Sequence, residues 1–143
     1  MSNVIALMGH GNYATGIKST IKSIVGPTVG VNYIDFLEED SSENLMEKAT
    51  KVVEENKGNN IVFICDILGG TPFNTAVKIS LENKAIGVVA GCNMNAIIEM
   101  VIGKDSFQLE ELTDELVNRT KNSVCVYKNS EVDIKDRTYE DGI

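Results

Sequence analysis

His10 and Asp66 are the residues whose types and positions best suit covalent chemistry. His10 is the only histidine of the chain and stands between two glycines, directly after an apolar run. Asp66 ends a second apolar run, "NIVFICD". A carboxylate that accepts a hydrogen bond from one imidazole nitrogen fixes the tautomer, leaves a lone pair on the other nitrogen and stabilises positive charge on the ring. Because the chain has no G-x-S-x-G sequence to present a serine nucleophile, the pair favours His10 itself as the nucleophile.

The segment "GGTPFN" (residues 69–74) predicts what such a nucleophile would receive. Its glycines let a ligand approach the backbone closely, its threonine offers a hydroxyl, and its proline suits the first position of a helix. Backbone N–H groups at a helix start favour an anion. A phosphoryl group on His10 can therefore be held there by neutral donors. The candidate phosphate-binding residues are Gly11, Gly69, Gly70 and Thr71.

Both motifs also have other interpretations. The stretch "GNYATGIKS" is one residue away from a nucleotide-binding P-loop, because one residue separates its second glycine from Lys18. That extra residue turns the lysine by about 100° around a helix, away from the phosphates that it would contact in a P-loop. "GGTP" can be an ordinary tight turn, and Asp66 can be a cap for that turn or for the next helix. A non-catalytic binding module also remains open.

These residues lie at the ends of elements that alternate along the chain. Apolar runs predict strands, and apolar residues at helical spacing predict helices. The expected strands span 3–9, 30–38, 60–66 and 85–92, and the expected helices span 13–26, 40–58, 73–83, 93–103 and 106–122. The helix at 40–58 is expected to begin with a capping box of Asp40 and Glu43.

The alternation of strands and helices predicts an α/β fold, with a parallel sheet that has helices on both faces. In such folds, the working groups gather beyond the carboxyl ends of the strands. His10 stands at the end of the first strand and Asp66 at the end of the third. If those two strands are neighbours in the sheet, the two side chains can meet in one crevice.

The segment "SVCVYKN" (123–129) predicts a short final strand. Its valines alternate with a cysteine and a tyrosine, so both faces of the strand would be largely apolar. A lone edge strand of that kind promotes aggregation unless it is paired, and pairing with the sheet of a second copy would close a two-fold dimer. The domain is therefore expected to span 1–129, with the charged residues 130–143 as a tail or the start of a linker.

The composition restricts the partners. The net charge of −8 disfavours nucleic acid, whose phosphates attract basic surfaces. The only arginines, Arg119 and Arg137, come late in the chain, so a phosphate near the N-terminus must be held without them. The cysteines at 65, 92 and 125 have no metal-ligand spacing and predict buried, reduced thiols in a cytoplasmic protein. We expect no metal, no cofactor, no signal peptide and no membrane span.

Three segments carry a resemblance to a known family over about residues 3–128. They are the apolar run that ends in "GHG", the segment "CDILGGTPFN", and "VVAGCNMN" at the fourth expected strand. In these segments the chain resembles the enzyme IIA component of the mannose-type (mannose–fructose–sorbose) bacterial phosphoenolpyruvate-dependent sugar phosphotransferase system.

The resemblance implies a phosphoryl carrier in sugar uptake. His10 would accept phosphate from the histidine phosphocarrier protein HPr and pass it to a IIB component. The IIB component would phosphorylate the sugar that the membrane subunits IIC and IID transport. Asp66 matches the aspartate that orients the histidine, and Thr71 matches a Ser or Thr near the phosphate. Ile67 stands where the family often has Thr, which removes a second hydroxyl.

Two further implications come from the resemblance. The family leads us to expect a homodimer that exchanges a C-terminal strand, for which residues 123–129 are the candidate. A relay subunit of a dihydroxyacetone kinase system shares this domain type and is the alternative function. The partner that accepts the phosphate distinguishes the two.

Overall fold

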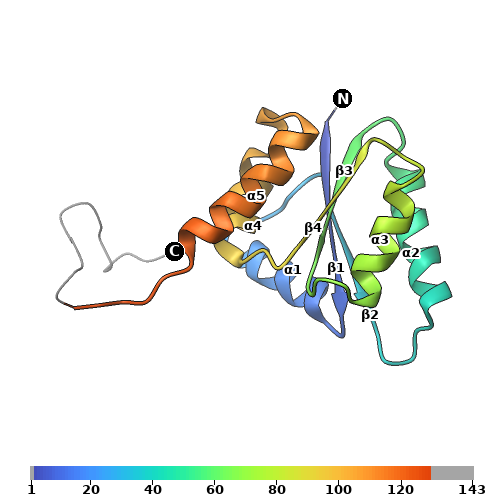
Figure 1. The fold of residues 1–143 in the computed structure, drawn as a ribbon, viewed down its shortest axis with the longest axis horizontal. Helices are drawn as coiled ribbons and strands as arrows, with labels where there is room; N and C mark the ends of the chain where they lie inside the picture. The colour runs from blue at the N-terminus through green and yellow to red at the C-terminus, as the bar shows by residue number, and fades with distance from the viewer. Residues whose placement is uncertain (1, 130–143) are drawn as a thin grey trace.

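The computed structural model describes residues 2–129 (Figure 1). The strands are β1 (Asn3–His10), β2 (Val31–Phe36), β3 (Asn60–Cys65) and β4 (Ile86–Ala90). The helices are α1 (Tyr13–Ile24), α2 (Ser42–Glu55), α3 (Thr71–Ser80), α4 (Met94–Gly103) and α5 (Leu109–Ser123), with the 3₁₀-helix η1 (Lys104–Ser106) between the last two. Strands and helices alternate as predicted, which confirms the α/β fold.

The sheet is parallel, and its strand order is β2-β1-β3-β4. The first and third strands are therefore neighbours, which is the condition that the sequence left open. The register pairs Met8 of β1 with Cys65 of β3. Asp66, the next residue after Cys65, therefore lies at the same carboxyl edge of the sheet as His10.

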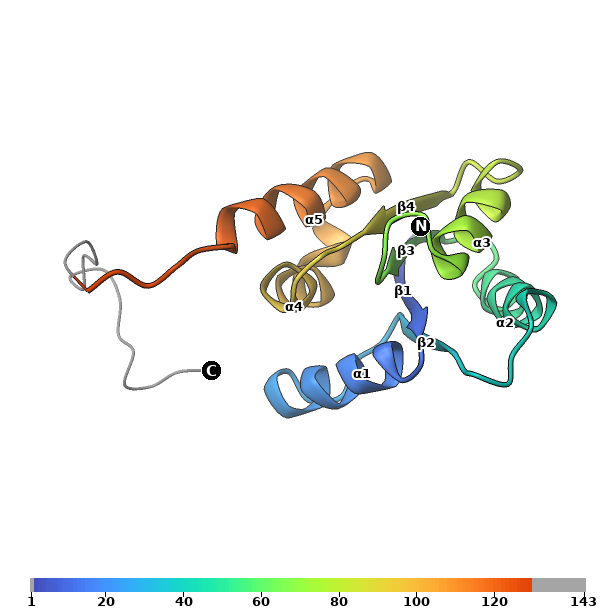
Figure 2. The ribbon, with the colours of Figure 1, turned by 60° about the horizontal axis from the view of Figure 1, so that its bottom comes forward.

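Helices cover both faces of the sheet, as predicted (Figure 2). One face packs against α1, α4 and α5, and the other packs against α2 and α3. The central strand β1 is buried along all but its last residue. Because side chains alternate along a strand, Ile5 and Leu7 enter the first of these cores, whereas Ala6 and Met8 enter the second. Burial on both faces holds His10 at the end of a rigid element.

The capping box of α2 lies one residue later than expected. It is formed by Ser41 and Asn44, which exchange hydrogen bonds of 3.1 Å and 2.9 Å. The Asp40 carboxylate is occupied elsewhere, because it accepts hydrogen bonds from the Leu37 N–H at 2.9 Å and from the Lys48 ammonium group at 2.6 Å. Asp40, which the sequence pattern assigned to the cap, therefore binds Lys48 of the same helix instead of the helix start.

The predicted strand at 123–129 is absent from the single chain. Ser123 is the last residue of α5, and residues 124–129 form no strand. Three apolar side chains of this segment are largely exposed: Val124 (71%), Val126 (72%) and Tyr127 (66%). The expected tail at 130–143 lies outside the described residues. Exchange of this segment between two chains stays a prediction.

The cysteines are free, but only one of them is fully buried. Cys65 is buried, Cys92 is half-buried and Cys125 is exposed, so the prediction of three buried thiols is wrong for Cys125. Burial raises the pKa of Cys65 to about 12, and burial also raises the pKa of Cys92. Both of these thiols therefore stay protonated at neutral pH.

Candidate phosphohistidine site

The structure brings His10 and Asp66 into direct contact. His10 Nδ1 lies 2.8 Å from Asp66 Oδ2, and the same oxygen accepts the backbone N–H of His10 at 2.9 Å. The imidazole side chain is 43% exposed, whereas the carboxylate side chain is only 13% exposed. The contact therefore occupies the Nδ1 side of a ring that is open to solvent, and Nε2 takes no part in it.

The carboxylate of Asp66 is held in its charged form. Burial raises its pKa, but hydrogen bonds from the backbone and the ring of His10, together with the ring's charge, act in the opposite direction. The Ile67 N–H adds a further hydrogen bond of 2.9 Å to the second oxygen, Oδ1. The net result is a pKa below the usual value of 3.8. An ionised acceptor at neutral pH keeps the imidazole proton on Nδ1.

The loop after Asp66 packs against the imidazole. A Cβ atom added to Gly70 would lie 3.0 Å from His10 Cε1, the ring carbon between the two nitrogens. Gly69 has a φ of +79°, a backbone conformation that favours glycine. Asn74 fixes the loop, because its N–H donates to Gly70 O at 2.9 Å and its side-chain amide donates to Gly69 O at 3.1 Å. The start of α3 is therefore held close to the ring.

Thr71 and Gly11 have different positions in this arrangement. Thr71 is the half-buried first residue of α3, a helix with no acidic residue in its first turn. The first N–H groups of a helix have no intrahelical partner and suit an anion. Gly11 has a φ of +55°, and its N–H donates to Phe36 O at 2.7 Å. The backbone donor of Gly11 is therefore occupied by the last residue of β2.

Two aromatic residues that the sequence analysis did not assign to the site lie against it. The rings of Phe36 and His10 meet edge to face, with centroids 5.7 Å apart. The two residues are partners in the β1–β2 register, a relation that becomes visible only when the strand pairing is known. Tyr13 packs against Gly9. Its hydroxyl is buried and has no hydrogen-bond partner among the described residues, and burial raises its pKa well above the usual value.

The P-loop interpretation of the first glycine-rich stretch does not fit the structure. The chain is helical from Tyr13, so Gly16 lies inside α1 rather than in a loop. Lys18 extends over the ring of Tyr33, with its Nζ 5.5 Å from the ring centroid. No phosphate-cradling loop is left between the two glycines.

We expect Gly9→Ala to destabilise the fold and disturb the site. A Cβ atom at this position would lie 2.4 Å from Tyr13 Cδ2 and 2.9 Å from Asp66 Cγ, so one of these groups must move. Overpacking of this kind lowers the free energy of unfolding by about 1–3 kcal/mol. Urea denaturation of the variant measures this loss.

Gly16→Ala is the matched control for that substitution. Gly16 lies in α1, and nothing lies within 4 Å of an added Cβ atom. Alanine in a helix interior is favoured over glycine by about 0.5–1 kcal/mol, so this variant should be slightly more stable than the original chain. Equal stability of the Gly9→Ala variant and the original chain would contradict the close packing described above.

The described part of the chain, residues 2–129, contains neither a membrane-spanning helix nor a cluster of metal-binding side chains. None of its helices has the length and the apolar character that a bilayer span requires. No three of its histidine, cysteine, aspartate and glutamate side chains are grouped in a way that could hold a metal ion.

Comparison with known proteins places this chain in a family. The model of the family described as "PTS system fructose IIA component" (EIIA-man) matches residues 4–117. The sorbose-specific EIIA component of Lacticaseibacillus casei is 27% identical over 113 residues, which cover 79% of this chain and 82% of that protein. The mannose-specific EIIAB component of Escherichia coli K12 is 29% identical over 118 residues, which cover 82% of this chain and 36% of that longer protein.

Solved structures agree with the sequence relatives. The phosphotransferase system component EIIA from Streptococcus agalactiae has a TM-score of 0.80 at 28% identity, over 87% of this chain and 96% of that one. The mannose/sorbose-specific IIA subunit from Enterococcus faecalis has the same fold, with a TM-score of 0.83 at 24% identity over 93% of this chain and all of that one. The chain belongs to the mannose-type IIA family of the phosphotransferase system, whose members take part in sugar uptake.

Proposed function

We propose that the chain is a phosphoryl carrier, in which Nε2 of His10 takes a phosphoryl group from HPr and gives it to a IIB component. The observation that supports this most strongly is the 2.8 Å contact between His10 Nδ1 and Asp66 Oδ2 on a ring that is 43% exposed. The contact leaves Nε2 as the nitrogen with a free lone pair. The exposure leaves room for a donor protein.

In the first step, the Nε2 lone pair attacks the phosphorus atom of the phosphohistidine of HPr. A new N–P bond forms, the N–P bond of the donor breaks, and the donor nitrogen keeps the electron pair. The proton on His10 Nδ1 stays in place, and the Asp66 carboxylate stabilises the positive charge that develops on the ring. In the second step, a nucleophile of the acceptor attacks the same phosphorus atom and Nε2 leaves.

The phosphoryl group would rest against neutral donors. Gly70 lies beside Cε1 of the ring, and the first N–H groups of α3 follow directly. Arg119, the only arginine among the described residues, lies on α5 and is paired with Glu99 and Glu115. Without a guanidinium group to hold it, the phosphoryl group is easily given away, as a relay requires.

Two exposed apolar side chains next to the site suit contact with partner proteins. Ile67 and Leu68 directly follow Asp66 and are 56% and 78% exposed. An isoleucine at position 67 offers no hydroxyl to the phosphate, but it offers apolar surface beside His10. Apolar side chains at the centre of an interface contribute most when water is excluded around them.

The names of the relatives point to the acceptor. The Escherichia coli relative is described as EIIAB, so an A and a B component share that protein. We propose a IIB component as the acceptor for this chain as well. The relatives are described as specific for sorbose, mannose or fructose, and the sugar would be selected by the B and membrane components.

Incubation with radiolabelled phosphoenolpyruvate, enzyme I and HPr tests the donor half of the proposal. Label should enter the chain only when HPr is present. The labelled chain is then mixed with IIB components or with the other subunits of a dihydroxyacetone kinase. Transfer to a IIB component supports the proposal. Transfer to the kinase subunits alone would show that a dihydroxyacetone kinase, and not a IIB component, is the acceptor.

We expect Thr71→Val to slow phosphoryl transfer by about fivefold. The substitution keeps the shape of the side chain and removes the hydroxyl at the start of α3. A lost hydrogen bond costs about 1 kcal/mol, and Ile67 has no hydroxyl to replace it. Rapid-quench measurements of labelling by phosphorylated HPr give the rate. Thr71→Ser, which keeps the hydroxyl, should transfer at the original rate. Equal rates for the Ser and Val variants would show that the Thr71 hydroxyl does not bind the phosphoryl group.

We propose that the chain is a homodimer that pairs residues 124–129 with the sheet of its partner. The exposed valines and tyrosine of this segment have no cover within the described part of one chain. Deletion of residues 124–143 should give a monomer or an insoluble chain, because the pairing segment is lost. Deletion of residues 131–143 should leave the dimer intact. Sedimentation at micromolar concentration measures both, and a monomeric full-length chain would rule out the exchange.

A further inference from the structure

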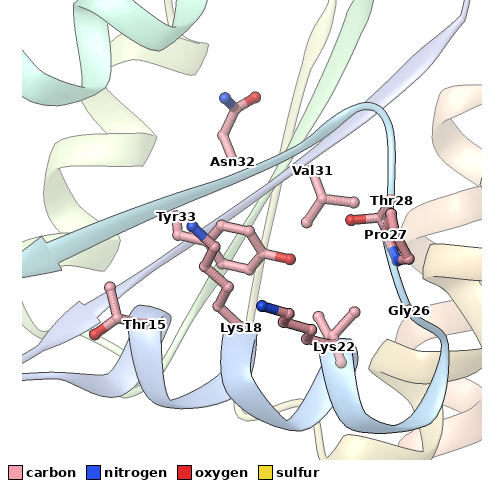
Figure 3. A pocket seen from close by; sticks show the side chains of 10 residues that line it. Thr15, Lys18, Lys22, Gly26, Pro27, Thr28, Val31, Asn32 and Tyr33 are labelled. Carbon is pink, nitrogen blue, oxygen red and sulfur yellow. The ribbon is translucent and has the colours of Figure 1, made fainter.

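A cavity separate from the His10 site lies between α1 and the edge strand β2. It has a volume of about 620 Å³ and extends from Thr15 in the first turn of α1 to the turn at Gly26, Pro27 and Thr28 (Figure 3). This volume lies within the range of small-molecule sites, about 300–1,000 Å³. No proposed step of phosphoryl transfer uses this cavity.

The lining of the cavity is positive, although the chain has a net charge of −8. Lys18 and Lys22, one helical turn apart on α1, both extend toward Tyr33 of β2 (Figure 3). None of the ten lining residues carries a carboxylate. In the described part of the chain, neither lysine takes part in a salt bridge, whereas Lys48, Lys51 and Lys104 all do.

Two hydroxyls of the cavity also have free donors. The hydroxyls of Tyr33 and Thr28 make no hydrogen bond within residues 2–129, and Figure 3 shows both on the wall formed by β2 and the turn before it. The hydroxyl of Thr15 is different, because it donates to the Asp35 carboxylate at 2.6 Å. Val31 and Pro27 supply apolar surface beside these donors.

We propose that this cavity binds a small phosphomonoester, such as a sugar phosphate. A phosphomonoester carries a charge of about −1.5 to −2 at pH 7, which the two ammonium groups of the cavity neutralise. A ligand with a single carboxylate carries only a single negative charge and would leave one ammonium group unmatched. Hydroxyls add donors to the phosphate oxygens or to the sugar. Lysines bind phosphate as point charges without the bidentate geometry of arginine, so the ligand can exchange readily.

Titration of the full chain with hexose 6-phosphate, followed by backbone amide NMR, tests the proposal. The His10→Ala variant is titrated in parallel, so that phosphate bound near His10 is not mistaken for this site. We expect saturable shifts at residues 26–33 in both proteins. The neutral hexose should cause none, and acetate, which has a single carboxylate, should bind at least tenfold more weakly. Because the binding does not need His10, failure of the phosphoryl-carrier proposal would leave this result unchanged.

Variants of the lining residues test the assignment. Lys18→Gln combined with Lys22→Gln should weaken binding of hexose 6-phosphate at least tenfold. The matched control, Lys78→Gln combined with Lys84→Gln, removes two exposed lysines outside the cavity and should change the affinity less than twofold. Tyr33→Phe keeps the ring and removes one hydroxyl, and it should weaken binding about tenfold because the acceptor is charged.

Three results would overturn the proposal. They are the absence of saturable shifts at residues 26–33, an affinity that the double lysine variant leaves unchanged, and binding of acetate as tight as that of hexose 6-phosphate. The last result would make the cavity a general anion site rather than a phosphomonoester site.

Discussion

Replacement of His10 by alanine is expected to abolish phosphoryl labelling of the chain. The imidazole is the only one in the sequence, so no second histidine can take over. Labelling by phosphoenolpyruvate, enzyme I and HPr should fall to background. In the original chain, the label should be lost in acid and survive alkali, as expected for phosphate bound to nitrogen.

The fold should survive this substitution. The side chain of His10 is half exposed, and its backbone N–H can still donate to Asp66 Oδ2, a bond of 2.9 Å in the original chain. Circular dichroism and urea denaturation check that the variant is folded. Undiminished labelling of a folded His10→Ala variant would falsify the proposal that His10 carries the phosphoryl group.

Asp66→Asn is expected to slow phosphoryl transfer by about 10²- to 10⁴-fold, where the upper figure is the loss that the same substitution causes in a Ser-His-Asp triad. The amide has nearly the same shape, but it carries no charge to stabilise the ring. Its NH₂ group can donate to Nδ1 and so favour the tautomer with the proton on Nε2. Rapid-quench labelling measures the rate, and ³¹P NMR of the phosphorylated original chain identifies the nitrogen that carries the phosphate.

Asp114→Asn is the control for loss of charge. Asp114 is an exposed residue of α5, away from His10, so its variant should transfer at the original rate. A phosphate found on Nδ1 of the original chain would contradict the geometry, because that nitrogen faces Asp66. An Asp66→Asn variant that transfers normally would reduce Asp66 to a cap of the loop at Ile67, to whose N–H it is bonded.

The ionised carboxylate of Asp66 should also contribute to the stability of the fold, in a way that depends on pH. The pKa of Asp66 is lower in the folded chain than its usual value of 3.8, because the hydrogen bonds from His10 and Ile67 outweigh burial. The stabilisation that this shift provides is fully present above the usual pKa and is lost as the pH falls through the lowered value. The difference in unfolding free energy between the original chain and Asp66→Asn should therefore shrink when the pH falls below about 3.8.

The sequence by itself determined the order and type of the elements. An apolar run such as that of β1 can be buried only if both of its faces are covered, and the helical spacing of the intervening segments provides the cover. The sequence also placed His10 and Asp66 at strand ends, where the side chains of parallel strands gather. Both conclusions rest on local patterns, namely hydrophobic periodicity and the glycines that end each run.

Only the tertiary structure decided how these parts meet. The strand order made β1 and β3 neighbours, and that order depends on how helices pack on both faces rather than on any one segment. The contacts of His10 with Phe36 and Gly70 follow from this order, as does the packing of Tyr13 against Gly9. Whether residues 124–129 form a strand is decided in the same way, because an apolar alternating segment becomes a strand only where it pairs with the backbone of a neighbouring strand. They form no strand in the single chain, and their pairing with the sheet of a second copy stays a prediction.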